Sequence, residues 1–501
     1  MSANLADLVR AAAAERGDHV ALLSAGRALT WHQVDASVDT AAAGLQAVGL
    51  LPGDRVVIAL SNSPEFVAAY FGALRAGLVA VPANTGSTTA ELTGLIGDSG
   101  ARAVVFDRAS AAAARELADP HPTAALLRIV VGAPAPGEVA FGSFSGVPHE
   151  PDVDAEALAL LMYTSGTSGR PKGAMLSHRA LRASIEQVHA LAAPPVLADD
   201  VVLVVLPLFH IYALNGTLGA VARSAATAVL LDRFDPVETL DVVRRDGVTN
   251  IPGAPPMFVA WSQTPGLGEA FAGVRLLLTG AAPMAATVLE QIRTATGLPV
   301  FEGYGLTEAA PGVTSTLVGG AAKPGSVGRP LPGVEVRLVD EEGELAEDGD
   351  PGEIQVRGPN LFSGYWPDGS GGPDEEGWYA TGDVAYEDDD GDLVLVDRRK
   401  ELIIVSGFNV YPREVEDVVA AHPDVAEVAV VGVPHPYTGE AVKAYVVPKP
   451  GSHLGTSDVT TFVGTRLARF KWPTIVELVD ALPHSATGKV AKGRLRERSS
   501  G

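Results

Sequence analysis

The sequence predicts an α/β protein built mainly on parallel sheets, followed by a small antiparallel barrel and a separate C-terminal unit. Three features of the 501-residue chain lead to this prediction. Short apolar strands alternate with helical, alanine-rich segments up to about Glu302, and such alternation is typical of parallel sheets. From about Gly325, short strands are instead punctuated by Gly, Pro and Asp. After Arg398 a new pattern of strands and a helix begins.

Short apolar runs mark the strands of the first part. Runs of this length, bounded by Gly, Pro or charged residues, are typical of strands that are buried on both faces. We expect strands at Arg55–Leu60, Val79–Val81, Ala103–Phe106, Ala157–Met162, Val201–Leu206, Ala228–Leu231, Val274–Thr279 and Leu298–Glu302.

The elements after Gly325 are shorter and more interrupted. The strands expected in the barrel are Val334–Val339, Gly352–Arg357 and Leu393–Val396, and the acidic runs Asp340–Asp350 and Asp388–Asp392 are interpreted as solvated turns. The C-terminal unit is expected to have a helix at Arg413–Ala421 and strands at Val425–Val431 and Ala441–Val447. From Arg398 onward the chain has 14 Lys and Arg against 11 Asp and Glu, although the net charge of the whole chain is −23. This asymmetry indicates two domains.

Composition excludes several classes of function. The strong negative charge argues against nucleic-acid binding and against electrostatic docking on anionic lipid. There is no cysteine, so disulfides, thiolate metal sites and a cysteine nucleophile are excluded, and thioester chemistry would need an external thiol. The longest apolar run is far shorter than a membrane span, and the first residues do not resemble a secretory signal. We therefore expect a cytoplasmic protein, and only weak peripheral membrane contact stays open.

The segment Tyr163–Gly173 is the strongest local signal for function. It combines glycines, several hydroxyl side chains and Lys172 directly after an apolar strand, and a helical pattern follows from about Ser177. Glycines let backbone N–H groups approach an anion, and hydroxyls and a lysine add donors and charge. The spacing differs from the Walker pattern because Pro171 directly precedes the lysine. We expect a strand, a polyphosphate-binding loop and a helix.

This loop resembles the signature of the adenylate-forming superfamily, which includes acyl-CoA synthetases, peptide-synthetase adenylation domains and luciferases. Further similar motifs follow in the order typical of that superfamily, and together they cover nearly the whole chain. They are Leu51–Val56, Asn62–Phe66, Leu206–His210, Gly303–Glu308, Gly352–Ile354, Tyr379–Asp383, Val396–Lys400, Ser406–Pro412 and Thr487–Lys489.

The resemblance implies a fold and an activity. The fold is α/β, with a large N-terminal domain of two α/β lobes plus a small β-barrel over residues 1–397. A smaller α+β lid domain over residues 398–501 would rotate about a hinge near Lys400. The activity would be ATP-dependent conversion of a carboxylic acid to an acyl-adenylate plus pyrophosphate, followed by transfer of the acyl group to coenzyme A with release of AMP.

The resemblance also implies the catalytic residues. Lys489 matches the lid lysine that reaches the α-phosphate and the substrate carboxylate, whereas composition alone would make it one more solvated lysine of the tail. Thr307 would donate to the α-phosphate, and Glu308 would bind Mg²⁺. Lys172 would contact the β- and γ-phosphates. His210 would line the carboxylate end of the acyl pocket; its alternative is a buried core histidine.

The remaining binding residues follow from the same motifs. Arg398 and Asp383 would bind the ribose hydroxyls. The phosphate loop would contribute Thr164, Ser165, Gly166, Thr167, Ser168 and Gly169. The adenine would be enclosed by Gly280, Ala281, Ala282, Pro283, Gly303 and Tyr304, and Glu302 and Gly305 would also belong to the nucleotide-binding residues. In the second lid position, Ser406, Gly407 and Phe408 would line the tunnel of the thiol. One segment, Pro367–Pro373, departs from the superfamily pattern and is shorter and richer in glycine.

The nature of the acid is the main question left open. The segments around His210 and Pro252–Met257 are apolar, contain small residues and lack the aspartate with which amino-acid-activating domains bind an α-amine. Our first choice is a medium- to long-chain fatty acid, because Val396–Val415 resembles bacterial fatty acyl-CoA synthetases. The second is a 4-coumarate or cinnamate-type acid, because Phe209–Asn215 resembles the corresponding ligases. Two further hypotheses stay open: a carrier protein as acceptor in place of coenzyme A, and a non-catalytic adenine-nucleotide binder.

Overall fold

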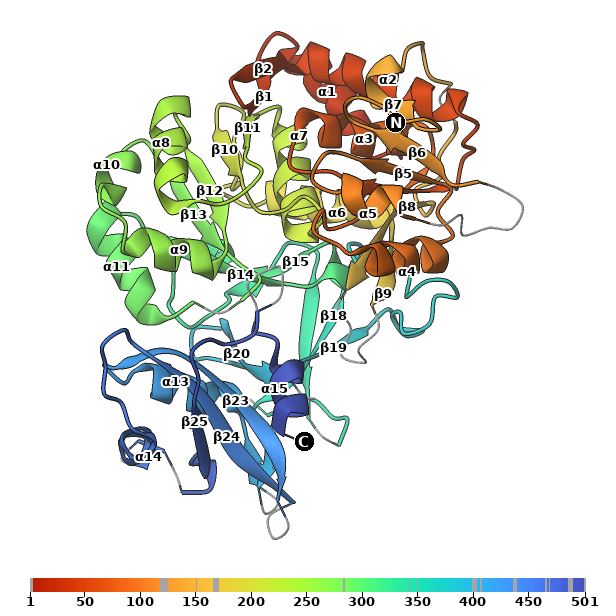
Figure 1. The fold of residues 1–501 in the computed structure, drawn as a ribbon. Coiled ribbons are helices and arrows are strands. Elements are labelled where there is room, and N and C mark those ends of the chain that lie inside the picture. The colour runs from red at the N-terminus through yellow and green to blue at the C-terminus, as the bar shows by residue number, and fades with distance from the viewer. Residues whose placement is uncertain are drawn as a thin grey trace.

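The protein was analysed as a computed structural model. It describes residues 3–117, 125–149, 151–164, 171–282, 284–340, 342–347, 349–398, 403–405, 408–435, 439–464, 466–467, 469–484 and 490–499. The elements fall into two large, mainly parallel sheets, a small antiparallel sheet and a C-terminal mixed sheet, and this agrees with the predicted α/β class (Figure 1). Among the described residues, no helix is both long enough and apolar enough to cross a bilayer.

The first large sheet has seven strands in the order β7-β6-β5-β3-β4-β8-β9. All neighbours are parallel except β8 and β9, which form an antiparallel pair. Its strands are β3 (Arg55–Ala59), β4 (Val79–Pro82), β5 (Ala103–Phe106), β6 (Leu127–Val130), β7 (Val139–Ala140), β8 (Leu158–Thr164) and β9 (Lys172–Ser177). The helices of this part of the chain are α1 (Asp7–Arg16), α2 (Trp31–Ala47), α3 (Pro64–Arg75), α4 (Thr89–Ser99), α5 (Ala111–Arg115) and α6 (His178–His189).

The second large sheet has nine strands in the order β16-β15-β14-β13-β12-β10-β11-β1-β2. Its central strands are parallel, and antiparallel strands close both edges. Its strands are β1 (Val20–Ser24), β2 (Arg27–Thr30), β10 (Val201–Val204), β11 (Thr227–Leu230), β12 (Asn250–Gly253), β13 (Leu276–Thr279), β14 (Val300–Gly305), β15 (Gly312–Ser315) and β16 (Arg329–Pro330). Its helices are α7 (Ala220–Ser224), α8 (Pro236–Asp246), α9 (Pro255–Ser262), α10 (Leu267–Ala270), α11 (Ala286–Thr296) and α12 (Thr316–Gly319).

One hydrophobic core joins these two sheets. It contains Ile58 of β3 and Val204 of β10, together with Tyr70 of α3 and Leu181 of α6. Neighbouring residues on the same strands, such as Val57, belong to other cores on the opposite faces. This alternation follows from the period of two in a strand and explains why the strands are apolar on both sides. The helices between the sheets therefore fix the two lobes against each other.

The antiparallel sheet follows, in the order β17-β18-β19-β20. Its strands are β17 (Glu335–Val339), β18 (Gly352–Arg357), β19 (Tyr379–Glu387) and β20 (Leu393–Arg398). An isolated bridge between Gly328 and Leu393 ties β20 to the segment before β16. The expected boundary after residue 397 falls at the end of β20, and the next described strand belongs to a different sheet.

The C-terminal unit lies against the antiparallel sheet (blue in Figure 1), where Arg413 donates to the carbonyl of Leu395 at 3.2 Å. In its sheet β25 pairs in parallel with β24, and the other pairs are antiparallel. The strands are β21 (Ile403–Val405), β22 (Phe408–Val410), β23 (Val425–His435), β24 (Gly439–Pro448) and β25 (Ile475–Leu478), and the helices are α13 (Pro412–Ala420), α14 (Thr456–Gly464) and α15 (Lys492–Ser499).

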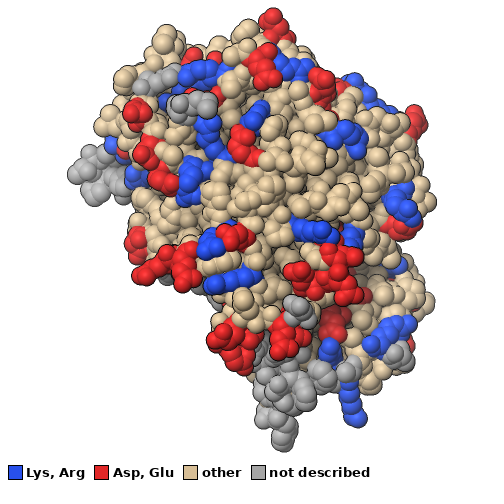
Figure 2. All heavy atoms as spheres, turned by 180° about the vertical axis from the view of Figure 1, so that it is seen from behind, with Lys and Arg blue, Asp and Glu red and all other residues tan. Residues whose placement is uncertain are grey.

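Charged residues are distributed in small mixed groups on the face opposite to that of Figure 1. Figure 2 shows Lys and Arg interspersed with Asp and Glu, and no broad basic patch on that face.

Candidate active site

A cavity of about 190 Å³ lies at the carboxyl ends of β12, β13 and β14. Its wall includes the backbone of Gly280, just after β13, and of Gly303 and Gly305 on β14. Thr307 and His210 also line it. Ligands of open α/β sheets bind at the carboxyl ends of the strands, because loops of variable sequence meet there. The cavity therefore occupies the position expected of a binding site in this fold.

Close backbone packing explains one of the glycines in the wall. A Cβ added to Gly305 would lie 2.2 Å from the carbonyl oxygen of Pro311, so no larger residue fits without moving this turn. The turn includes a short 3₁₀ helix, Thr307–Ala309, which carries Thr307 and Glu308 directly after β14. Thr307 faces the cavity, whereas Glu308 is 9% exposed.

A π-helical segment, Tyr212–Gly219, forms another wall of the cavity. Its Thr217 hydroxyl donates to the carbonyl of Tyr212 at 3.2 Å. Positions for a Cβ on Gly216 and Gly280 would lie 3.3 and 3.6 Å from atoms of the Tyr212 ring, so the two glycines make room for this ring. Burial raises the pKa of Tyr212. Tyr212 was not predicted as a site residue from the sequence; π-helical turns such as this one are frequent at functional sites.

Tyr304 connects the cavity to the antiparallel sheet. Its hydroxyl donates to Oδ2 of Asp383 at 2.6 Å. Asp383 on β19 and Arg398 on β20 are direct partners in the antiparallel ladder. The two residues expected to bind one ribose are therefore neighbours, and Tyr304 brings Asp383 to the edge of the cavity.

Glu308 is held by a tyrosine that sequence analysis did not identify. The hydroxyl of Tyr365 donates to Oε1 of Glu308 at 2.6 Å and lies 3.3 Å from the hydroxyl of Tyr379. The ammonium of Lys172 lies over the Tyr365 ring, 5.1 Å from its centroid. Burial and then the Glu308 charge raise the pKa of Tyr365, and the same two causes raise the pKa of Tyr379 to about 12. Both phenols therefore remain protonated donors at neutral pH.

Glu302 occupies a buried position on β14, next to the residues that line the cavity. Desolvation raises the pKa of its carboxyl to about 7, although the charge of Arg413 from the C-terminal unit opposes this shift. The side chain is 7% exposed, and Glu302 is not among the residues that line the cavity. This position supports a packing role beneath the nucleotide region more than direct contact with adenine.

The expected order of strand, loop and helix around Lys172 is wrong. Lys172 begins a second strand, β9, which pairs with β8 so that Thr164 lies opposite Lys172. The helix α6 begins only at His178, with Ser177 as its N-cap. β8 and β9 are therefore antiparallel partners at one edge of the sheet, and the residues between them, 165–170, lie outside the described part of the chain. An added Cβ on Gly173 would lie 2.8 Å from the end of the Leu161 side chain, so a larger residue here would require that side chain to shift.

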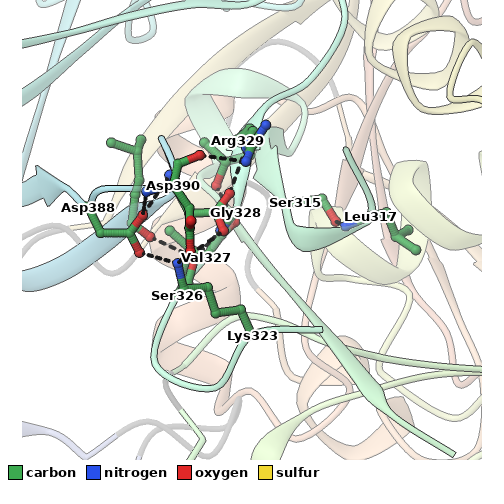
Figure 3. A network of polar contacts seen from close by, with 12 residues as sticks. Ser315, Leu317, Lys323, Ser326, Val327, Gly328, Arg329, Asp388 and Asp390 are labelled. Atoms are coloured by element: carbon green, nitrogen blue, oxygen red, sulfur yellow. Dashed lines mark hydrogen bonds and ion pairs between the residues drawn. The ribbon is translucent and has the colours of Figure 1, made fainter. Parts of the chain in front are cut away.

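The acidic run Asp388–Asp392 is not a simple solvated turn. Lys323 lies 2.7 Å from Asp388 and 2.6 Å from Asp390 (Figure 3). Arg329 contacts Asp392 at 2.8 Å. The side chains of Asp388 and Asp392 are 19% and 12% exposed. Hydrogen bonding to Lys323 lowers the pKa of Asp388. This clamp fastens the turn of the β19–β20 hairpin, which carries Asp383 near its other end.

The segments expected to face the acid are only partly at the cavity. His210 lines it, and the backbone N–H of Tyr212 lies 3.4 Å from His210 Nδ1. Of the segment Pro252–Met257, Pro252 reaches the wall, whereas Met257 packs into the core with Phe258 and Trp261 because α9 begins at Pro255. One apolar part of the wall comes from α6 and the segment after it. It includes Ile185, Val188, Leu191, Pro195 and Val196.

The remaining expected site residues are described only in part, or lie outside the described part of the chain. Arg398 and Phe408 are described by their backbone, in β20 and β22. Ala281 lines the cavity and Ala282 follows it in the chain. Outside the described residues lie Ser165, Gly166, Thr167, Ser168, Gly169, Pro283, Lys400, Ser406, Gly407 and Lys489.

The fold and the cavity define an α/β enzyme with a nucleotide-type site at the ends of its strands, joined to a small C-terminal unit. Residues 9–366 match the AMP-binding enzyme family, and residues 414–489 match the AMP-binding enzyme C-terminal domain. The chain belongs to the AMP-binding enzyme family, and within it to the AMP-forming acyl-CoA synthetases and ligases.

Relatives with different substrates resemble the chain to a similar degree. It is 38% identical to a feruloyl-CoA synthase of Amycolatopsis sp over 477 residues, which cover 94% of each chain. It is 33% identical to a long-chain-fatty-acid–CoA ligase of Bacillus subtilis (strain 168), covering 99% of this chain and 94% of that one. The crystal structure of ATP-bound MatB from Rhodopseudomonas palustris superimposes with a TM-score of 0.91 at 34% identity, covering 99% of both chains.

Proposed function

We propose that the protein joins a carboxylic acid to ATP, releases pyrophosphate, and passes the resulting acyl-adenylate to the thiol of coenzyme A. The observation that carries this proposal is the arrangement of the cavity. Thr307 and His210 line a space whose wall is partly apolar. Asp383 accepts a hydrogen bond from Tyr304 of this wall, and Glu308 directly follows Thr307 in the chain. An apolar acid could thus place its carboxylate at the polar end, where the α-phosphate must also lie.

The residue roles follow from the charge that develops in the first step. Attack of the carboxylate on the α-phosphate places extra negative charge on its oxygens, so fixed donors and cations lower the barrier. We assign donation there to Thr307 and to Lys489 of the lid, and the triphosphate to Lys172 and the loop before it. Asp383 and Arg398 would accept from and donate to the ribose hydroxyls. Rotation of the lid near Lys400 would then bring Ser406–Phe408 to the incoming thiol.

Glu308 fits the requirements of Mg²⁺. One of its oxygens accepts from Tyr365, and no other side-chain hydrogen bond to this carboxylate is found among the described residues. The part of the chain that the structure describes has no group of three acidic or histidine side chains that could hold a metal alone. Mg²⁺ typically takes one or two carboxylates and completes its shell with water and phosphate oxygens. When bound, it would neutralise phosphate charge, while Glu308 orients it.

A medium- to long-chain fatty acid is our first choice of substrate. The wall from Ile185 to Val196 is apolar, and each CH₂ buried there should gain about 0.8 kcal/mol, or nearly fourfold in kcat/KM. A hydroxycinnamate-type acid is the second candidate. It is favoured by the 38% identity to the feruloyl-CoA synthase, compared with 33% to the fatty-acid ligase.

A panel of acids distinguishes the two candidate substrates. The protein would be assayed with ATP, Mg²⁺ and coenzyme A for pyrophosphate and thioester, using saturated acids from hexanoate to hexadecanoate and the ring acids cinnamate, coumarate and ferulate. The fatty-acid proposal predicts a steady rise of kcat/KM with chain length and then a sharp fall. If ferulate or coumarate exceeds dodecanoate, the second candidate replaces the first. Pyrophosphate without thioester would instead favour a carrier protein as acceptor.

A further inference from the structure

The segment 363–373, whose part Pro367–Pro373 departs from the superfamily pattern, docks on the edge of the first large sheet. Ser363 donates its N–H to the carbonyl of Met175 at 2.9 Å, and Met175 donates to Gly364 at 3.0 Å. Trp366 donates to Gly173 at 2.8 Å. These contacts pair the segment with β9, the strand that begins at Lys172. The segment is therefore fixed beside the base of the anion-binding loop.

A tight turn directs two aromatic residues of this segment to different places. Gly364 has φ of 103°, and a Cβ there would lie 2.0 Å from the carbonyl oxygen of Gly369, so the turn requires glycine. Trp366 reaches away from the cavity, where its Nε1 donates to the carbonyl of Asp98 at 2.9 Å. Tyr365 instead reaches Glu308, with 2.6 Å between its hydroxyl and Oε1.

Tyr365 contacts two groups that come from distant parts of the chain. Its hydroxyl donates to Glu308, and its ring face lies under the ammonium of Lys172. The Phe362 and Tyr365 rings pack edge to face at 5.1 Å, so the Tyr365 ring has little freedom to rotate. A neutral donor fixes the direction of a carboxylate without cancelling its charge, and a ring face attracts a cation without neutralising it. Both Glu308 and Lys172 thus keep full charge for a ligand.

We propose that Tyr365 is a positioning residue that holds Glu308 toward the divalent cation of bound ATP and holds Lys172 toward the phosphates. This inference rests on the proposed function, because it assumes that ATP with its cation binds beside Glu308. Tyr365 touches neither reactant; it acts through the two charged groups. The tight turn at Gly364, which carries Tyr365 directly before the shortened segment Pro367–Pro373, thereby contributes to cation-dependent nucleotide binding.

The test compares ATP affinity with and without Mg²⁺ in the full-length protein. Tyr365→Phe removes one oxygen and keeps the ring under Lys172. We expect the Kd for ATP in the presence of Mg²⁺ to rise about tenfold, as for a lost hydrogen bond to a charged group, while the Kd in EDTA changes less than twofold. Trp366→Phe is the matched control, because it removes a side-chain hydrogen bond from the residue next to Tyr365 and should leave both affinities within twofold.

A double-mutant cycle separates positioning from a general effect on folding. In a Glu308→Gln background, Tyr365→Phe should cause no further loss of affinity for ATP with Mg²⁺, because the group it positions no longer carries a charge. Equal losses with and without Mg²⁺, or an equal loss in Trp366→Phe, would overturn the proposal. Wild-type ATP affinity that is independent of Mg²⁺ would also overturn it. The proposed function is tested independently of the role of Tyr365, because it depends on whether the wild-type protein releases pyrophosphate with an acid of the panel.

Discussion

Two carboxylates near the cavity, the buried Glu308 and the partly buried Asp383, are held by the same kind of contact. Tyr304 donates to Asp383 and Tyr365 donates to Glu308, each at 2.6 Å. A lysine or arginine in either place would compete with a ligand for the negative charge, whereas a phenol leaves most of it available. The arrangement suits carboxylates that must accept from ribose hydroxyls or bind a cation.

Replacing Asp383 should affect ATP more than the acid. In Asp383→Ala the ribose loses a charged acceptor, and such a loss costs about 1.5–3 kcal/mol, or roughly 10–150-fold in KM for ATP. The KM for the acid should change less than threefold, because the acid lies at the other end of the cavity. Steady-state kinetics with each substrate varied in turn measures both constants. A similar rise in both would contradict a ribose role and indicate a folding defect.

Glu302 should make stability depend on pH between about 5 and 7. Desolvation raises the pKa of this carboxyl from 4.5 to about 7 in the folded protein. In this window the folded state binds a proton that the unfolded state has released, so stability falls as pH rises, by up to about 1.4 kcal/mol per pH unit. The Tm of the wild type should therefore decrease relative to Glu302→Gln from pH 5 to 7, and the difference should level off above pH 7.5.

Glu290→Gln is the control for this measurement. Glu290 is exposed, and its hydrogen bond with Arg293 lowers the pKa of its carboxyl, so both states are ionised over the same window. Its Tm should follow that of the wild type from pH 5 to 7. A Glu302→Gln curve parallel to the wild type would show that Glu302 is ionised in the folded protein throughout.

At the scale of elements, buried strands were the most predictable part of the chain. Ala103–Phe106 and Gly352–Arg357 were predicted with their observed bounds, because each is a compact β-prone run between turn residues. β9 was missed because Lys172–Ser177 was included in a presumed loop-to-helix transition. Its strand character depends on pairing with β8, and such long-range pairing leaves only a weak trace in a local pattern.

The site was predictable where motifs carry it and not where tertiary contacts create it. The motifs predicted that Asp383 and Arg398 bind the same ribose, and the two residues are direct partners in the β19–β20 ladder. Tyr365 was not identified, because only folding brings its hydroxyl to Glu308. The clamp around Lys323 was likewise hidden, since an acidic run is interpreted as solvated until a basic partner from elsewhere in the chain is known.

Gly364 offers a test of the turn that carries Tyr365. Gly364→Ala would place a methyl group 2.0 Å from the Gly369 carbonyl oxygen at a φ of 103°, so the turn must rearrange. Backbone strain of this kind costs about 1–3 kcal/mol, and the clash adds to it. We expect a lower Tm and loss of the Mg²⁺-dependent part of ATP affinity. Gly142→Ala, where an added Cβ meets nothing within 4 Å, should change neither quantity.

At the scale of the whole molecule, a rotating lid predicts that one substitution can slow adenylate formation without slowing thioester formation. Lys489→Ala should slow pyrophosphate release by orders of magnitude but leave thioester formation from supplied acyl-adenylate and coenzyme A nearly unchanged, because the lysine is proposed to serve only the first lid position. Rapid-quench assays of each half-reaction measure this. Arg494→Ala, another basic residue near the C-terminus, is the control and should leave both rates within twofold. An equal fall of both rates in Lys489→Ala would contradict a rotating lid.

The measurement that tests the central claim most directly is detection of the enzyme-formed acyl-adenylate and its conversion. The wild-type protein would be incubated with ATP, Mg²⁺ and dodecanoate without coenzyme A, and the products followed by mass spectrometry. The account predicts dodecanoyl-AMP and one pyrophosphate per site, and then dodecanoyl-CoA and AMP when coenzyme A is added; ferulate would give the corresponding products if the second candidate is right. Thioester formation with release of ADP and phosphate, or no adenylate from any acid of the panel, would contradict it.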